Sequence, residues 1–127
     1  MKNIHRVLSC VLILILAVCF FMTKAQAQGT TDFFDSLYDI PRMPGLKEMP
    51  EFSLNFESPQ GRVAEAGATF SGVNPADILR FYHQVLPSFG WQARGEVFFV
   101  RDGEILHIVV DEPDTPGIVR LYISPSP

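Results

Sequence analysis

Hydrophobic and polar residues alternate along several segments of this chain, and such alternation predicts half-buried β-strands. Two of these segments, 52–57 and 62–70, flank the turn-forming residues Ser58-Pro59-Gln60-Gly61 and therefore predict a hairpin. One side of the second strand carries Ala64, Ala66, Ala68 and Phe70. Because most of these side chains are small, we expect another element to pack closely over them.

A helix is predicted directly after this hairpin. Asn74 is a favourable N-cap, and Pro75 suits the first helical position. Apolar residues then recur at helical spacing, which is typical of a helix that lies on a sheet; they are Ile78, Phe81, Tyr82 and Val85. Pro87 ends the helix, and Gly90 allows the chain to reverse.

The last third of the chain predicts three consecutive strands. Residues 96–101 and 104–110 flank Asp102-Gly103, which is a strong signal for a tight hairpin, and 118–123 forms the last strand. The expected fold is therefore α+β, a small antiparallel sheet with one helix on a face, in the order ββαβββ.

The two-residue turn at Asp102-Gly103 sets the register of the hairpin, because it pairs Arg101 with Glu104. Paired residues share a face of the sheet. One face then carries Val97, Phe99, Leu106, Ile108 and Val110, and the other carries Phe98, Val100, Ile105, His107 and Val109. Both faces are mostly apolar, whereas a sheet with one helix is expected to be polar on its uncovered face.

Something must therefore cover the second apolar face. There are three candidates for this cover: the segment 33–46 of the same chain, a second copy of the chain, or a different protein. We name the second face the candidate binding face; its residues are Phe98, Val100, Ile105, His107 and Val109, with Tyr122 as a neighbour.

The first 27 residues predict a cleavable signal peptide. A basic start precedes the apolar run Val7–Met22, and Ala25-Gln26-Ala27 has the small-x-small pattern of a cleavage site. The protein is then periplasmic or secreted, begins near Gln28 and keeps no stable membrane anchor. Retention of the run as an anchor is the alternative, although its 16 residues are short for a membrane span. The residues before Cys10 and Cys19 match a lipobox only weakly.

Residues 28–50 predict an extended, proline-rich segment, and residues 51–127 a single α+β domain. The spacing of apolar residues over 33–38 also allows one or two helical turns. The proline-rich part, 40–46, favours extended backbone. It either drapes its apolar side chains over the domain or presents a recognition segment to a partner.

Loss of the leader changes the charge and the cysteine content. It leaves 7 basic and 14 acidic residues, a net charge of −7 with histidine neutral. Such a surface repels phosphate backbones, so nucleic acid is not an expected partner. Both cysteines leave with the leader, which excludes disulfides and thiol chemistry from the exported domain.

The sequence indicates no catalytic site, no metal site and no cofactor. It has no nucleophile-elbow motif, and neither His83 nor His107 has a second histidine at metal-ligand spacing. The acidic run Asp111-Glu112-Pro113-Asp114 lacks the spacing of a calcium loop. We therefore expect a protein that is not an enzyme.

The helix and the residues after it carry a recognisable pattern. Phe81-Tyr82, Leu86-Pro87 and Gly90-Trp91 follow Pro41-Arg42-Met43-Pro44-Gly45 and precede Phe98-Phe99 and Arg101-Asp102-Gly103. Over roughly residues 40–123, this chain resembles small exported bacterial proteins and lipoproteins with an FY…LP..GW helix-to-strand motif. The resemblance implies export and an α+β fold in which the helix end packs onto the sheet. It implies no catalytic residue.

These observations favour a periplasmic or secreted, non-catalytic binding or structural module of the bacterial envelope. Its partner would be an envelope protein or a second copy, bound at the candidate binding face. The alternative is a small-ligand carrier or minor hydrolase with a pocket between helix and sheet, in which His107 or His83 is the polar group.

Overall fold

The computed structural model describes residue 3 and residues 31–112 and 114–127. The predicted signal peptide, Asn3 apart, lies outside these residues. Residues 31–127 form one compact unit. In the described part of the chain, no helix is both long enough and apolar enough to cross a membrane.

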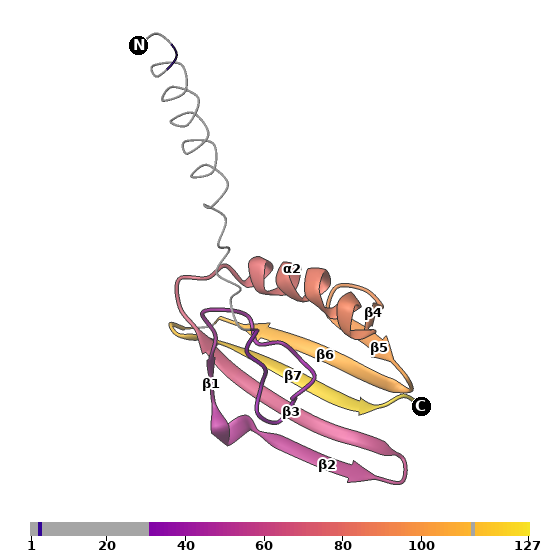
Figure 1. The fold of residues 1–127 in the computed structure, drawn as a ribbon. Helices are drawn as coiled ribbons and strands as arrows, with labels where there is room; N and C mark the ends of the chain where they lie inside the picture. The colour runs from indigo at the N-terminus through magenta and orange to yellow at the C-terminus, as the bar shows by residue number, and fades with distance from the viewer. Residues whose placement is uncertain (1–2, 4–30, 113) are drawn as a thin grey trace. The chain divides into compact units, whose positions relative to one another are not determined.

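The unit consists of one antiparallel sheet of seven strands and one α-helix over residues 31–127 (Figure 1). The elements are β1 (Lys47–Glu48), the 3-10 helix η1 (Pro50–Phe52), β2 (Leu54–Ser58), β3 (Gly61–Phe70), α2 (Pro75–Val85), the 3-10 helix η2 (Leu86–Phe89), β4 (Gln92–Ala93), β5 (Phe98–Arg101), β6 (Glu104–Asp111) and β7 (Gly117–Pro125).

The antiparallel sheet with one helix confirms the α+β class, but the order of the elements differs from the predicted ββαβββ. Along the chain the order is βββαββββ, because β1 and β4 are additional strands of two residues each. Strands this short show no alternation in the sequence. Across the sheet the order is β1-β3-β7-β6-β5-β4, and β2 pairs with β3 on the same edge as β1. The last strand in the sequence, β7, therefore lies in the middle of the sheet.

The helix forms as its sequence predicts. The Asn74 side chain accepts a hydrogen bond from the Ala76 backbone N–H at 2.9 Å, and Pro75 is the first helical residue. The chain then tightens into η2 and reverses at Gly90, whose φ of +85° is a left-handed conformation that glycine adopts without strain.

The register of the β5–β6 hairpin is also confirmed. Phe98 pairs with His107, and Arg101 pairs with Glu104. The turn between them has positive φ at both Asp102 (47°) and Gly103 (79°), as a type I′ turn requires.

The core lies on one side of the sheet. The fully buried strand residues all belong to the face that α2 covers; they are Ala64, Ala66, Ala68, Phe99, Leu106, Ile108, Val119, Leu121 and Ile123. The small alanines of β3 leave room for a neighbouring element, as expected. The helix contributes Ile78 and Tyr82 to the same core, and η2 contributes Leu86.

The N-terminal segment, residues 31–46, packs on this same side and not across the second face. Its buried side chains Phe34, Leu37, Ile40 and Leu46 belong to the core that α2 shares with the sheet. The helical turns that the spacing of residues 33–38 allowed are absent. The chain instead folds back on itself, with a bridge between Phe33 and Pro41 and a hydrogen bond from Phe34 N–H to the Ile40 carbonyl (3.3 Å).

Candidate functional site

The sheet face turned away from α2, here called the outer face, is covered neither by the helix nor by the N-terminal segment. The helix and the N-terminal segment both lie on the opposite side, where all the core residues gather (Figure 1). Of the three covers that the sequence left open, the segment 33–46 is therefore excluded in this structure.

The register brings the five predicted residues of the candidate binding face together on the outer face. Phe98 lies opposite His107, Val100 lies opposite Ile105, and Val109 follows His107 on the same side of β6. Phe98 is 42% exposed, and the other four are half-buried. They form a partly solvent-exposed apolar patch on β5 and β6.

His107 lies within a row of aromatic rings. Its ring stacks on Phe98, with centroids 4.3 Å apart and ring planes at 17°, and it lies 6.3 Å from the ring of Tyr122 on β7. Tyr122 is the direct cross-strand partner of His107. The imidazole thus packs as a flat, partly apolar group between two rings, and this packing accounts for a histidine on an otherwise apolar strand face.

Sequence reasoning missed a second apolar patch on the outer face. Leu54 (49% exposed) and Phe56 (61% exposed) on β2 lie beside Val63 (39% exposed) on β3. Alternation identified the apolar side of the strand correctly but predicted it half-buried, whereas Leu54 and Phe56 are exposed. Alternation alone does not say which side of a strand meets the core.

A polar strip separates the two patches. Glu65 pairs with Tyr122, and Arg120 pairs with Gly67. The Arg120 guanidinium lies 5.6 Å from the centre of the Phe52 ring. Phe52 in turn occupies the space over Gly67, where an added Cβ would come within 2.7 Å of the Phe52 Cβ. The middle of the outer face is therefore partly filled by side chains of the chain itself.

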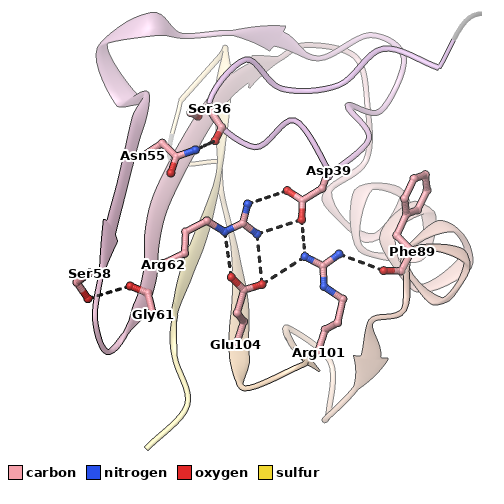
Figure 2. Close-up of polar contacts among 9 residues, drawn as sticks. All are labelled: Ser36, Asp39, Asn55, Ser58, Gly61, Arg62, Phe89, Arg101 and Glu104. Atoms are coloured by element: carbon pink, nitrogen blue, oxygen red, sulfur yellow. Dashed lines mark hydrogen bonds and ion pairs between the residues drawn. The ribbon is translucent and has the colours of Figure 1, made fainter.

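The covered side of the sheet holds a network of four charged residues, Asp39, Arg62, Arg101 and Glu104 (Figure 2). Arg62 donates two hydrogen bonds of 3.0 Å to the Asp39 carboxylate, and its Nε donates to Glu104 Oε1, also at 3.0 Å. Arg101 binds both carboxylates. The two positive and two negative charges balance within the network.

Arg101 also ties the network to the end of the helix. Its Nη1 donates to the Phe89 carbonyl at 3.1 Å, and its guanidinium lies 4.2 Å from the centre of the Trp91 ring. The network therefore joins the N-terminal segment, β3, the β5–β6 hairpin and η2. We call the network of Asp39, Arg62, Arg101 and Glu104 the clasp, because it connects these elements to one another.

The clasp changes the proton affinity of its members. Burial by itself raises the pKa of Asp39, but hydrogen bonds and charge from Arg62 and Arg101 outweigh burial, so this pKa lies below its ordinary value. The hydrogen bonds from Arg62 to Asp39 raise the pKa of the Arg62 guanidinium. Both groups are thus held in their charged forms.

The space between helix and sheet is occupied by side chains. Ile78, Tyr82 and Leu86 of the helix and its end are fully buried there. Burial strongly raises the pKa of the Tyr82 hydroxyl, which keeps it protonated. An open hollow of about 850 Å³ lies elsewhere, at the end of the sheet, lined by Arg62, Arg101, Glu104 and the turn residues around Gly61 and Gly103.

His83 and His107, the two histidines among the described residues, lie on opposite sides of the sheet and do not meet. His83 on α2 donates from Nε2 to the Glu96 carbonyl at 2.8 Å and packs 4.9 Å from Phe99, a core residue, whereas His107 lies on the outer face. Within the described residues, no three histidine, cysteine, aspartate or glutamate side chains gather closely enough to hold a metal ion.

Comparison with protein families, with curated proteins and with solved structures found no match for this chain. The resemblance to small exported bacterial proteins therefore stays a prediction from the sequence.

Proposed function

We propose that this chain is an exported, non-catalytic binding module of the bacterial envelope, and that its outer face contacts a protein partner at the candidate binding face. The basic start, apolar run and cleavage pattern of residues 1–27 support export. The net charge of −7 after cleavage makes nucleic acid an unfavourable partner.

One observation carries the proposal: the helix and the N-terminal segment both cover the same side of the sheet, so the apolar residues of β5 and β6 have no cover from the described chain. Apolar area that stays in contact with water contributes nothing to folding, whereas a partner that excludes this water gains roughly 25 cal/mol per Å². Contiguous patches of this kind on soluble proteins commonly mark interaction sites.

The filled layer between helix and sheet favours this proposal over a ligand carrier or hydrolase with a pocket there. Ile78 and Tyr82 occupy the place in which such a pocket would lie. His83 and His107, the polar groups of that alternative, lie on opposite sides of the sheet.

Site-specific photocrosslinking tests the proposed surface. The full-length chain carries a photoreactive residue at position 98 and a C-terminal tag, and it is expressed in the organism that encodes it. We expect a discrete crosslinked product from position 98. The matched control is position 38, since Tyr38 is 64% exposed but lies on the N-terminal segment at the other side of the sheet. Equal products from both positions would contradict the proposal.

Charged substitutions measure the contribution of the patch. Val100→Asp or Ile105→Asp would bury an unpaired carboxylate in the interface, so we expect the captured partner to fall by about tenfold or more. Tyr38→Asp serves as the control and should leave capture unchanged. Circular dichroism verifies that each variant is folded. Unchanged capture by both folded aspartate variants would exclude this face as the interface.

A further inference from the structure

Strand β2 forms an open edge of the sheet. It pairs with β3 on one side, from Leu54 opposite Glu65 to Ser58 opposite Gly61, and no described residue pairs with its other side (Figure 1). In an antiparallel ladder, alternate residues direct their N–H and C=O groups to opposite sides. Part of the β2 backbone therefore presents unpaired donors and acceptors to a further strand.

This edge has few of the features by which proteins usually protect an edge strand, and Glu57 is its only charged residue. The strand Leu54–Ser58 contains no proline and no lysine, and its pairing with β3 is continuous over five residues without a bulge. The opposite edge of the sheet ends in β4, which has only two residues. Short strands are poor templates, so β2 is the edge that can accept a partner.

Apolar side chains line the same edge. Phe56, the middle residue of β2, is 61% exposed, and Leu54 and Val63 lie beside it on the outer face. A strand added to β2 would bring its own side chains next to Leu54 and Phe56, whereas Val63 lies one strand further into the sheet. The edge thus offers backbone hydrogen bonds together with apolar contact, which are the two components of strand addition.

We propose that β2 pairs with β2 of a second copy of this chain, antiparallel and about a two-fold axis through Phe56. Centring the pair on the middle residue is the arrangement in which all five residues of each strand are paired. It places Phe56 opposite Phe56 of the second copy and Leu54 opposite Ser58 of the second copy. Aromatic pairs directly across two strands are among the favourable cross-strand contacts.

The charges of β2 fit this arrangement. Glu57 is its only charged residue, and the two-fold axis places it opposite Asn55 of the second copy. The Asn55 amide donates one hydrogen to the Ser36 carbonyl at 3.0 Å and keeps its second hydrogen for the facing carboxylate. No like charges lie directly opposite each other. A closed two-fold pair of this kind uses the same patch on both copies and ends after two chains. Five paired residues bury little area, so we expect a dimer that dissociates in the micromolar range.

Sedimentation equilibrium tests the dimer on protein purified from cells that express the full-length chain. We expect a monomer–dimer equilibrium that Phe56→Lys weakens at least tenfold, because two lysines would then lie opposite each other. Gln84→Lys is the control: Gln84 is an exposed residue of α2, which lies on the side of the sheet opposite the outer face, and its replacement should leave the equilibrium unchanged. A monomer at every concentration, or equal weakening by both variants, would overturn the proposal.

Disulfide trapping tests the position of the axis. In a background with Cys10→Ser and Cys19→Ser, Phe56→Cys should crosslink the dimer on oxidation, because residues directly opposite have Cα atoms about 4.5–5.5 Å apart. Leu54→Cys is the matched control. Its two copies would lie four positions apart along the strands, roughly 13 Å, and should not crosslink. Equal crosslinking by both variants would contradict this axis.

The dimer and the proposed partner surface can fail separately. The dimer depends on Phe56 and its neighbours on β2, whereas partner capture depends on Val100 and Ile105 on β5 and β6. A natural chain that captures its partner but stays monomeric would overturn only the dimer. A natural chain that dimerises but captures no partner would overturn only the partner surface.

Discussion

At the scale of single residues, Asp39 connects parts of the chain that are distant in sequence. Its carboxylate accepts hydrogen bonds from Arg62, 23 positions away, and from Arg101, 62 positions away. The four side chains of the clasp are 9–20% exposed, so water screens their charges only partly. Removal of one carboxylate would leave two guanidinium groups sharing Glu104 alone.

We expect Asp39→Asn to lower the free energy of unfolding at pH 7 by about 1–2 kcal/mol. This is less than the cost of breaking a fully buried ion pair, because the clasp is partly solvated. Urea denaturation measures the difference. Asp32→Asn is the control in the same segment: Asp32 is 67% exposed and lies 3.5 Å from Arg42, so its replacement should cost less than about 0.5 kcal/mol.

The pH dependence of this effect has a definite sign. The pKa of Asp39 is lower in the folded than in the unfolded chain, where it is near 3.8. Its stabilising contribution is therefore complete above that value and is lost as the pH falls through the lower, folded value. The stability difference between the natural chain and Asp39→Asn should be constant from pH 7 to pH 5 and shrink below pH 4. A difference that stays constant down to pH 2 would contradict the assigned role of the carboxylate.

At the scale of elements, the N-terminal segment 31–46 has no regular secondary structure but behaves as part of the core. It closes on itself through a hydrogen bond from Arg42 N–H to the Asp32 carbonyl at 2.7 Å. The Ser36 hydroxyl then donates to the Glu65 carbonyl at 2.6 Å, which attaches the segment to β3. Its contribution to stability should therefore match that of a helix or strand.

Leu37→Ala tests this expectation. The Leu37 side chain is fully buried, so its truncation removes apolar contact and leaves a cavity, at a cost of about 2–5 kcal/mol in the free energy of unfolding. Tyr38→Ala changes the neighbouring residue, which is 64% exposed, and should cost less than about 1 kcal/mol. Similar small losses for both variants, measured by urea denaturation, would show that the segment is only a loose tether.

Much of the element structure follows from local sequence signals. The N-cap at Asn74 and the turn at Asp102-Gly103 act through neighbouring backbone, so they predict the helix and the β5–β6 register correctly. Strands β1 and β4 were not predictable in this way, since two residues carry no period. The exposure of Leu54 and Phe56 on β2 was also missed, because it depends on which face of the sheet the helix and the N-terminal segment pack against.

The candidate binding face also follows from local sequence signals, whereas the clasp does not. The five residues of the candidate binding face share one side of the sheet because the hairpin register alone determines it. The clasp was not foreseen beyond the pair Arg101–Glu104, since the contact of Asp39 with Arg62 depends on the path of an irregular segment. Whether the face binds a partner stays a prediction.

At the scale of the whole molecule, the segment, the helix and the sheet share a single core, so residues 31–127 should unfold as one unit. Trp91 is the only tryptophan of the chain and is buried at the end of the helix, where its fluorescence reports local packing. Thermal unfolding followed by this fluorescence should coincide with unfolding followed by far-ultraviolet circular dichroism. An earlier transition in fluorescence would indicate that the helix end separates before the sheet.

The central place of β7 has a consequence for the order of events during biosynthesis. The hairpins β2–β3 and β5–β6 are each local, but only β7, which lies between β3 and β6, joins them into one sheet. A growing chain therefore cannot complete its core until the last strand has been made. For the proposed export, this delay would keep the chain unfolded until its synthesis is complete. An unfolded chain suits passage through a narrow membrane channel, which a polypeptide crosses in extended form.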